Sequence, residues 1–285
     1  MDVIDTVHEM QHRSDALRAA GETIALVPTM GFLHEGHLEL MRVGRRHADH
    51  LFISIFVNPA QFGPNEDFGK YPRDEEGDLS KAENAGVDLV FIPGVEEIYP
   101  EGFQTAVSVN RVTKHLCGLS RPGHFEGVTT VVAKLFHITK PHLAIFGQKD
   151  YQQLTVISRM VKDLNMDIEI VGVPTVREPD GLAMSSRNNY LGHEERKSAL
   201  CLKKSLDLAG HLLSQGERHA DRIKSAIEKL ILSHPFTEID YISICHPDTL
   251  EDIGIIEGET LVALAVKVGD TRLIDNGLIN KGRTS

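Results

Sequence analysis

The sequence contains no tryptophan, and aromatic residues make up only 6% of its 285 residues. A protein that binds nucleic acids by stacking bases on aromatic rings needs more of them. Basic residues are also in deficit, because 30 lysines and arginines face 41 aspartates and glutamates, which gives a formal net charge of −11. We therefore expect no broad basic surface and no nucleic-acid partner. An anionic ligand would have to be neutralised locally, by a few placed cationic side chains or a bound cation.

Cysteine is scarce as well. The three cysteines, Cys117, Cys201 and Cys245, lie far apart, and no CxxC pair occurs. An odd number without that spacing predicts neither a zinc ribbon nor a disulfide framework. Free thiols are typical of a reducing compartment, so we expect a cytoplasmic location.

Long apolar runs are missing too. No stretch approaches the roughly 18 apolar residues that a helix needs to cross a bilayer. Residues 1–18 are polar and acidic and lack the apolar segment of a signal peptide. We therefore expect a soluble intracellular protein that does not bind membranes.

The first part of the chain alternates short apolar runs with helical patterns. Most of the runs are rich in β-branched residues and end at Pro, Gly or Asn, as in strands of a parallel sheet covered on both faces. This alternation predicts an α/β domain over residues 1–176, with a Rossmann-like, doubly wound parallel sheet whose ligands bind at the carboxyl ends of the strands. The runs lie at 24–27, 51–57, 87–92, 143–146 and 168–173, and the helical patterns at 37–48, 74–85, 126–138 and 150–163.

The pattern changes after Pro174. Residues 193–214 and 219–233 have helical periodicity, and three strand-like runs follow, at 241–245, 260–268 and 272–276. Since the chain also exceeds the usual length of a single domain, we predict a second, smaller α+β domain over residues 177–285. It begins with a polar segment that is rich in turn-forming residues.

Two histidines stand three residues apart after the first of these apolar runs, in PTMGFLHEGH, residues 28–37. Pro28 is expected to end the strand, Gly31 to permit a tight turn, and a helix to begin near Gly36. Such a strand–turn–helix presents backbone N–H groups and a helix N-terminus to a phosphate. The motif is neither a Walker loop nor HExxH. By themselves, His34 and His37 could be packed or surface residues, an anion clamp or, least favoured, metal ligands.

Three further polar segments could contribute to a site. Asn58 and Gln61 follow the second apolar run and carry amides that both donate and accept hydrogen bonds. Lys149 and Asp150 follow another run, where the lysine suits a phosphate and the carboxylate suits a ribose hydroxyl or a metal-bound water. Residues 185–187, Ser-Ser-Arg, resemble loops that close over triphosphates. Each segment alone could be an ordinary solvated loop, but together they favour nucleotide triphosphate chemistry.

As a set, these motifs resemble those of the pantothenate synthetases, also called pantoate–β-alanine ligases. The matching segments extend from about residue 24 to 191 and are PTMGFLHEGH, FVNPAQFGPNEDFGKYPR, CGLSRPGHFEGVTTVVAKLF, FGQKDYQQL and REPDGLAMSSRN. The resemblance implies a nucleotidylyltransferase-superfamily enzyme, with HEGH as the HIGH motif and MSSRN as the KMSKS motif, where Ser186 occupies a position that is often lysine. It implies ATP-dependent condensation of (R)-pantoate with β-alanine through a pantoyl adenylate, giving pantothenate, AMP and pyrophosphate.

The resemblance also implies roles for individual residues. His37 would donate a proton, and His34, Lys149 and Arg187 would be the other catalytic residues. The ATP site would comprise Met30, Gly31, Phe32, Leu33, His34, Glu35, Gly36, His37, Gly147, Gln148, Lys149, Asp150, Val176, Met184, Ser185, Ser186 and Arg187. Pantoate and β-alanine would bind to Gln61, Gln153, Phe62, Asn58 and Met30.

The same resemblance implies ATP as a co-substrate with Mg²⁺, no tight metal site formed by the protein, and a homodimer. Two alternatives stay open. One is a nucleotidyltransferase that transfers AMP or CMP to a phosphate, for which the Gln61 and Gln153 amides are poorly suited. The other is a non-catalytic protein that binds metal or nucleic acid through HxxH. A tRNA synthetase is disfavoured because the C-terminal part of the chain lacks a basic face that could read an anticodon.

Overall fold

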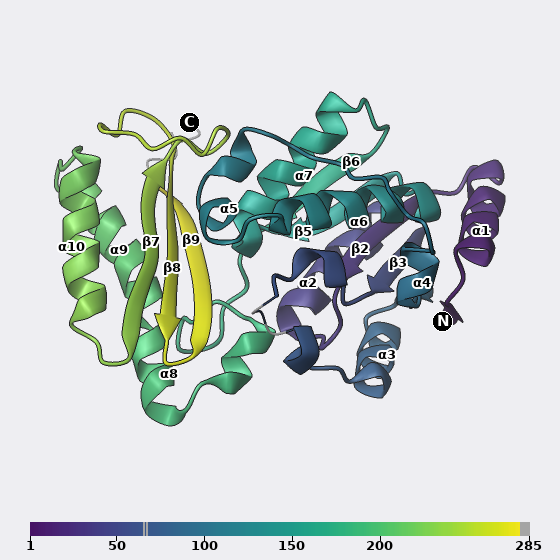
Figure 1. The fold of residues 1–285 in the computed structure, drawn as a ribbon, viewed down its shortest axis with the longest axis horizontal. Coiled ribbons are helices and arrows are strands. Elements are labelled where there is room, and N and C mark those ends of the chain that lie inside the picture. The colour runs from purple at the N-terminus through teal and green to yellow at the C-terminus, as the bar shows by residue number, and fades with distance from the viewer. Residues whose placement is uncertain (65, 67, 280–285) are drawn as a thin grey trace. The chain divides into compact units, whose positions relative to one another are not determined.

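The computed structural model describes residues 1–64, 66 and 68–279, and Figure 1 shows its helices and strands. The chain forms two compact units, which are described separately below. Unit 1 comprises residues 1–110, 121–148 and 153–174, and unit 2 comprises residues 111–120, 149–152 and those from 175 onward.

Unit 1 is built on a parallel sheet with the order β1-β4-β3-β2-β5-β6. The predicted parallel α/β fold is thus confirmed, and each of the five apolar runs forms a strand. The sequence did not reveal β1, because it is only three residues long. The strands are β1 (Asp2–Ile4), β2 (Ile24–Thr29), β3 (His50–Ile55), β4 (Leu89–Phe91), β5 (Leu143–Gly147) and β6 (Glu169–Val173).

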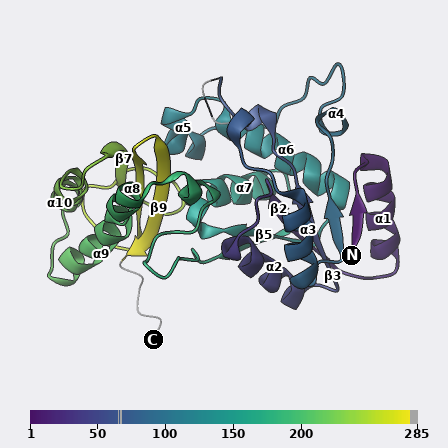
Figure 2. The ribbon, with the colours of Figure 1, turned by 90° about the horizontal axis from the view of Figure 1, so that it is seen from below.

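Helices cover both faces of this sheet. In Figure 2, α2 lies on one side of the strands and α6 on the other. Met41 and Val43 of α2 share a buried cluster with Val27 of β2 and Ile53 of β3. The helices that belong wholly or mostly to unit 1 are α1 (Val7–Ala19), α2 (Glu35–His47), α3 (Glu75–Asn84), α4 (Val95–Ile98), α6 (His124–Thr139) and α7 (Tyr151–Asp163), with short 3-10 turns at Pro59–Gln61 and Phe68–Lys70. A further 3-10 turn, Gln148–Asp150, begins in unit 1 and continues in unit 2.

Pro28 does not end β2, as the sequence suggested, because the strand continues to Thr29. Backbone groups along β2 face its two neighbours alternately, and the carbonyl of Ile24 accepts from the N–H of His142 on the β5 side. Pro28, four residues after Ile24, also faces the β5 side, but β5 pairs only with Ala25 and Leu26. At Pro28 the pairing with β5 has already ended, so the N–H that proline lacks is not needed there.

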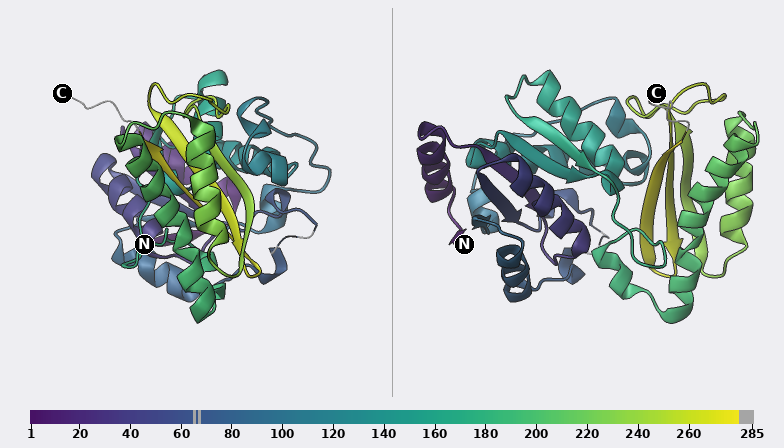
Figure 3. Two further views of the ribbon diagram at one scale, coloured as in Figure 1. Left: turned by 90° about the vertical axis from the view of Figure 1, so that its left-hand side faces the viewer. Right: turned by 180° about the vertical axis from the view of Figure 1, so that it is seen from behind.

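Unit 2 contains a three-stranded antiparallel sheet with the order β7-β8-β9. Helices α9 and α10 pack on one face of it (Figure 3), and their buried side chains, such as Leu202 and Ile227, join Val262 and Leu264 of β8 in one core. The expected single helix over 193–214 is divided at Leu200. The elements are a 3-10 turn at Val112–Lys114, α5 (Cys117–Ser120), a 3-10 helix at Ser186–Tyr190, α8 (His193–Ala199), α9 (Cys201–Ser214), α10 (Ala220–Leu232), β7 (Thr237–Cys245), β8 (Thr260–Val268) and β9 (Thr271–Ile279).

The division into units does not follow the single cut at 176/177 that the sequence suggested. Segments 111–120 and 149–152 belong with unit 2, where the side chain of Gln152 joins them. Its Nε2 donates to the carbonyls of Val112 (2.9 Å) and His115 (2.7 Å), and its Oε1 accepts from the N–H of Cys117 (2.9 Å). Because this link is a tertiary contact of one buried amide, no change in composition marks it.

Candidate active site

The segment that follows β2 and includes the first three residues of α2, residues 30–37, is called the histidine loop here. Its backbone adopts left-handed conformations at Gly31 (φ 79°) and Phe32 (φ 51°), and α2 then begins at Glu35. The carboxylate of Asp78, on α3, accepts hydrogen bonds from the N–H groups of Phe32 (2.7 Å) and Leu33 (2.6 Å). Asp78 is only 1% exposed, so a buried charge holds this turn in place.

Burial raises the pKa of Asp78, and the two backbone hydrogen bonds oppose this rise. The contact is also close, because a Cβ added at Gly31 would lie 2.9 Å from an Asp78 carboxylate oxygen. Glycine at this position therefore accommodates both the positive φ and the short distance to Asp78. No pattern in the sequence indicated that Asp78 belongs to the site, since it lies 46 residues from Phe32.

The two histidines lie together at the start of α2. Their rings are 4.0 Å apart, centroid to centroid, and are inclined by 30°. The N–H of His34 donates to Nδ1 of His37 across 3.3 Å. When neutral, His37 must then carry its proton on Nε2, because Nδ1 acts as the acceptor.

The segment that follows β3, residues 58–62, is called the amide segment here. Gln61 donates from Nε2 to the Sδ of Met30 at 2.9 Å, so this segment meets the histidine loop. The ring of Phe62 packs edge-on against the rings of Phe68 and Tyr71, with centroid distances of 5.4 and 6.0 Å. Three residues implied for substrate binding, Met30, Gln61 and Phe62, are thus close to one another and partly buried.

Asn58 has a different position. It is 1% exposed and lies behind Gln61 rather than at a surface that a ligand could contact. Its Oδ1 accepts from the N–H of Ala60 (3.2 Å) and the hydroxyl of Tyr99 (2.9 Å). Its Nδ2 donates to the carbonyl of Gly127 (3.1 Å) and to Oε1 of Gln61 (3.3 Å). This differs from the direct substrate contact that the resemblance implied for Asn58.

Charged residues brace the other side of the amide segment. Nε of Arg121 donates to Glu66 (2.7 Å), and its Nη2 donates to the carbonyl of Gln61 (3.3 Å). Nδ1 of His124 lies 2.8 Å from the same carbonyl. Burial raises the pKa of Glu66, but the hydrogen bond and charge of Arg121 outweigh this effect, so its net pKa is lowered.

The end of β5 carries the other expected nucleotide-binding segment. Gly147 ends the strand, Gln148 follows it, and Gln153 lies partly buried on α7, all three within unit 1. Lys149 and Asp150 belong to unit 2, where Nζ and the carboxylate are 3.7 Å apart. The carbonyl of Lys149 is fixed by a 2.8 Å hydrogen bond from the side chain of Asn276 on β9.

In unit 2, residues 176–184 form a small hairpin. The N–H of Met184 donates to the carbonyl of Val176 at 3.0 Å, and Arg177 pairs with Ala183 across the hairpin. The guanidinium of Arg177 also holds both carboxylate oxygens of Asp275, at 2.7 and 2.9 Å. Asp275 is 2% exposed, so this bidentate pair anchors the hairpin to β9.

The Ser-Ser-Arg segment follows this hairpin directly. Ser185 caps the 3-10 helix that begins at Ser186, and its Oγ accepts from the N–H of Arg187 at 3.3 Å. Asn188 fastens the helix by donating to Glu178 (2.6 Å) and to the carbonyl of Ala183 (3.0 Å). The segment implied to bind phosphates is therefore built on an anchored hairpin.

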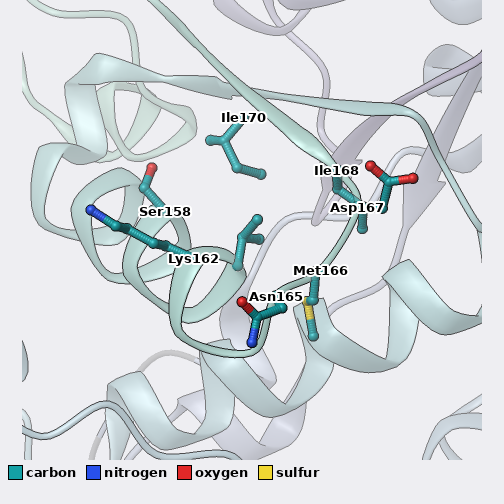
Figure 4. Close-up of a pocket in the computed structure, with 8 residues that line it drawn as sticks. Ser158, Lys162, Asn165, Met166, Asp167, Ile168 and Ile170 are labelled. Carbon is teal, nitrogen blue, oxygen red and sulfur yellow. The ribbon is translucent and has the colours of Figure 1, made fainter.

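A surface hollow of approximately 470 Å³ lies elsewhere in unit 1, between α7 and β6 (Figure 4). Lys162, Asn165 and Asp167 are among the residues that line it. It adjoins the amino end of β6, whereas the histidine loop follows the carboxyl end of β2 in the same parallel sheet. The hollow is thus separate from the residues implied by the resemblance.

Within residues 1–64, 66 and 68–279, no three His, Cys, Asp or Glu side chains are grouped so that they could hold a metal ion. Over the same part of the chain, no helix is long and apolar enough to cross a bilayer.

The profile of the pantoate-beta-alanine ligase family matches residues 2–278. A pantothenate synthetase from Syntrophus aciditrophicus is 60% identical over 97% of this chain and 96% of its own length. One from Geobacter sulfurreducens is 58% identical over 99% of both chains.

Solved structures agree with these relatives. The pantothenate synthetase of Thermus thermophilus superposes with a TM-score of 0.91 at 47% identity, covering 97% of this chain and 99% of its own. The pantoate-beta-alanine ligase of Francisella tularensis, solved with β,γ-ATP and β-alanine, gives a TM-score of 0.78 at 32% identity, with coverages of 98% and 97%.

Proposed function

Since the chain belongs to the pantoate–β-alanine ligase family, it is an ATP-dependent ligase that condenses pantoate with β-alanine, and we propose which of its residues carry the reaction. In the first step the pantoate carboxylate attacks the α-phosphorus of ATP and pyrophosphate leaves. In the second step the amine of β-alanine attacks the acyl carbon of the adenylate, and AMP leaves with pantothenate as the product.

His37 is the proposed proton donor to the nucleotide. Its support is the hydrogen bond from the N–H of His34 to Nδ1, which leaves Nε2–H as the donor of the neutral ring. A ring held in this way donates to a phosphate oxygen in the ground state and more strongly as charge develops in the transition state. His34, whose ring lies 4.0 Å away, would bind the same anion.

Lys149 and Arg187 would neutralise the phosphates, with Ser185 and Ser186 as hydroxyl donors. The guanidinium can bind two phosphate oxygens at once, whereas the ammonium acts as a point charge. The backbone N–H groups at the start of α2, with Gly147, Gln148, Asp150, Val176 and Met184, complete the proposed ATP site. Such local cations are needed because the net charge of the chain is −11.

Gln61 and Gln153 would bind pantoate, with Met30 and Phe62 as an apolar wall for its gem-dimethyl group. The observation that carries this assignment is the 2.9 Å contact from Gln61 Nε2 to Met30 Sδ, next to the histidine loop. Uncharged amides suit the task because a carboxylate locked in an ion pair would be a weaker nucleophile. Methyl contacts discriminate between acids by only about 1–3 kcal/mol per methylene.

Mg²⁺ is proposed to arrive as part of the substrate MgATP. Since the described residues hold no group of three metal-binding side chains, the phosphates and water would supply most of its ligands.

We also propose a homodimer in the cytoplasm. The resemblance supports the dimer, and the three buried free thiols suit a reducing compartment. Light scattering on a sizing column would test the dimer, and a monomer at micromolar concentration would contradict it.

The decisive test of the reaction is a pyrophosphate-release assay with single omissions. Pyrophosphate should appear with ATP and pantoate alone, up to one equivalent per site, and AMP should follow only after β-alanine is added. Turnover of ATP that needs a phosphorylated acceptor instead of pantoate would identify a different nucleotidyltransferase.

A further inference from the structure

Asn58 uses all of its hydrogen-bonding capacity inside unit 1. Its two amide hydrogens meet the carbonyl of Gly127 and Oε1 of Gln61, and its oxygen meets the N–H of Ala60 and the hydroxyl of Tyr99. A backbone N–H can only donate and a backbone carbonyl can only accept. A flipped Asn58 amide would thus oppose donor to donor at Ala60 and acceptor to acceptor at Gly127. The direction of this amide is fixed.

This direction sets the next amide in turn. Because Nδ2 of Asn58 faces Gln61, the carbonyl oxygen of Gln61 must face Asn58. Nε2 of Gln61 then points the other way, to the Met30 side, where it lies 2.9 Å from the sulfur. Gln61 therefore presents a hydrogen-bond donor, not an acceptor, toward the proposed pantoate site.

Tyr99 is the first residue of this series of hydrogen bonds, which continues through Asn58 to Gln61. Its hydroxyl donates to Asn58 across 2.9 Å, and its ring packs against Phe56 and Phe103, with centroid distances of 6.4 and 5.1 Å. Burial raises the pKa of Tyr99 to about 12, so the phenol stays protonated and keeps its donor role at neutral pH. It lies 41 residues from Asn58 and outside every motif quoted above.

Close packing holds Gly127 of α6 against the amide segment. Helix α6 approaches the amide segment so closely that a Cβ at Gly127 would lie 2.2 Å from the carbonyl oxygen of Ala60. Glycine at this position therefore brings the acceptor of Gly127 within reach of Asn58.

We infer that Tyr99 is a positioning residue: its hydroxyl holds Asn58 in place, in the direction set by the backbone of Ala60 and Gly127, and Asn58 in turn directs Gln61 so that Nε2 donates to an acceptor oxygen, hydroxyl or carboxylate, of the acid substrate. The inference rests on the proposed role of Gln61 in binding pantoate. It assigns Asn58 to the hydrogen-bond relay from Tyr99 through Asn58 to Gln61, not to substrate contact.

The experiment is a double-mutant cycle read in the KM for pantoate. Tyr99→Phe keeps the ring and removes the hydroxyl, and should raise that KM by about three- to tenfold, the size of one lost neutral hydrogen bond. The KM for ATP and the circular dichroism spectrum should not change. In a Gln61→Ala background, Tyr99→Phe should have no further effect on the KM for pantoate, because the amide that it orients is gone.

Tyr241→Phe is the matched control. It also removes a partly buried hydroxyl, but from unit 2, where the partner is Cys117. The KM for pantoate should stay at the wild-type value.

Each other outcome overturns a specific claim. Equal KM increases by Tyr99→Phe in the wild-type and Gln61→Ala backgrounds would show a merely structural role. A wild-type KM in the Tyr99→Phe variant, with a raised KM in Gln61→Ala, would overturn the relay alone. A wild-type KM in Gln61→Ala would overturn both the relay and the proposed pantoate site, while pantothenate formation, followed in the same assay, would still test the reaction itself.

Discussion

The histidine loop and the amide segment follow neighbouring strands of one sheet, yet they are held by different means. A buried carboxylate, Asp78, fixes the histidine loop through two backbone N–H groups. A neutral side chain, Asn58, fixes the amide segment through four hydrogen bonds, two donated by its Nδ2 and two accepted by its Oδ1. A charged anchor holds a strained backbone firmly but depends on pH, whereas an amide anchor also fixes the direction of its neighbour. The histidine loop would thus serve phosphate chemistry, and the amide segment recognition of the acid.

The largest effect is expected where the proposed chemistry takes place. His37→Ala should slow adenylate formation by about 10²- to 10³-fold, because it removes a proton donor to the developing charge. Quenched-flow measurement of the first turnover would show this. Pantoate binding, measured by calorimetry, should change little, in contrast to Gln61→Ala. His8→Ala, on the exposed side of α1, is the control. A near-normal first turnover would remove His37 from the mechanism.

Removing the charged anchor should have the next largest effect. Asp78→Ala leaves two N–H groups without their acceptor, which costs about 1–3 kcal/mol for each in the free energy of unfolding. Displacement of the loop should also slow adenylate formation by about 10- to 100-fold. Urea unfolding and pyrophosphate release would measure the two effects.

Asp74→Ala provides the control on the same helix. Asp74 caps the N-terminus of α3 by accepting from the N–H of Gly77, so this hydrogen bond stays within the helix. It should lower stability by about 1 kcal/mol with little loss of adenylation rate. If both variants slowed adenylation equally, the anchoring role of Asp78 would be wrong.

A smaller effect should separate backbone strain from crowding in the histidine loop. Gly21 and Gly31 have nearly equal positive φ angles, 82° and 79°, but only Gly31 has close neighbours, at 2.9 and 3.0 Å from an added Cβ. Gly21→Ala should cost about 1–2 kcal/mol of unfolding free energy for the left-handed backbone. Gly31→Ala should lower the unfolding free energy further, because the added methyl group must also displace Asp78. Equal losses in urea unfolding would show that Asp78 does not crowd this turn.

The smallest effect is on the pH dependence of stability, which should have opposite signs for Asp78, beside the histidine loop, and for Glu66, which pairs with Arg121 beside the amide segment. Because burial raises the pKa of Asp78 above 3.8, the part of its contribution to stability that depends on proton binding is complete below 3.8 and is lost as pH rises through the raised pKa. The pKa of Glu66 is lowered below 4.5, since the hydrogen bond and charge of Arg121 outweigh burial. Its contribution is complete above 4.5 and is lost as pH falls through the lowered pKa.

Urea unfolding from about pH 3.5 to 6 would measure these slopes. With rising pH, the stability of wild type relative to Asp78→Asn should fall, and that relative to Glu66→Gln should rise. Slopes of the same sign would contradict the assigned environments.

The sequence predicted β2, β3, β4 and β5 well because they are largely buried and read as continuous apolar runs. It predicted β8 over residues 260–268 for the same reason. It missed α1, whose buried side chains are only Met10 and Ser14, so that little apolar periodicity marks it. It also placed the end of β2 too early, because a proline ends a strand only where its N–H would have been needed.

The sequence by itself determined the family, the parallel sheet and the segments that carry His34, His37, Lys149 and Ser185–Arg187, because local runs, glycines and motif spacing encode them. Only the tertiary structure decided how some of these groups are presented. It placed Asp78 under the histidine loop, set the tautomer of His37 and turned the donor of Gln61 outward through Asn58 and Tyr99. The anchoring bonds of Asp78 and Tyr99 join partners 46 and 41 residues apart in the chain. A linear pattern also does not record which atom of an amide or imidazole faces its partner.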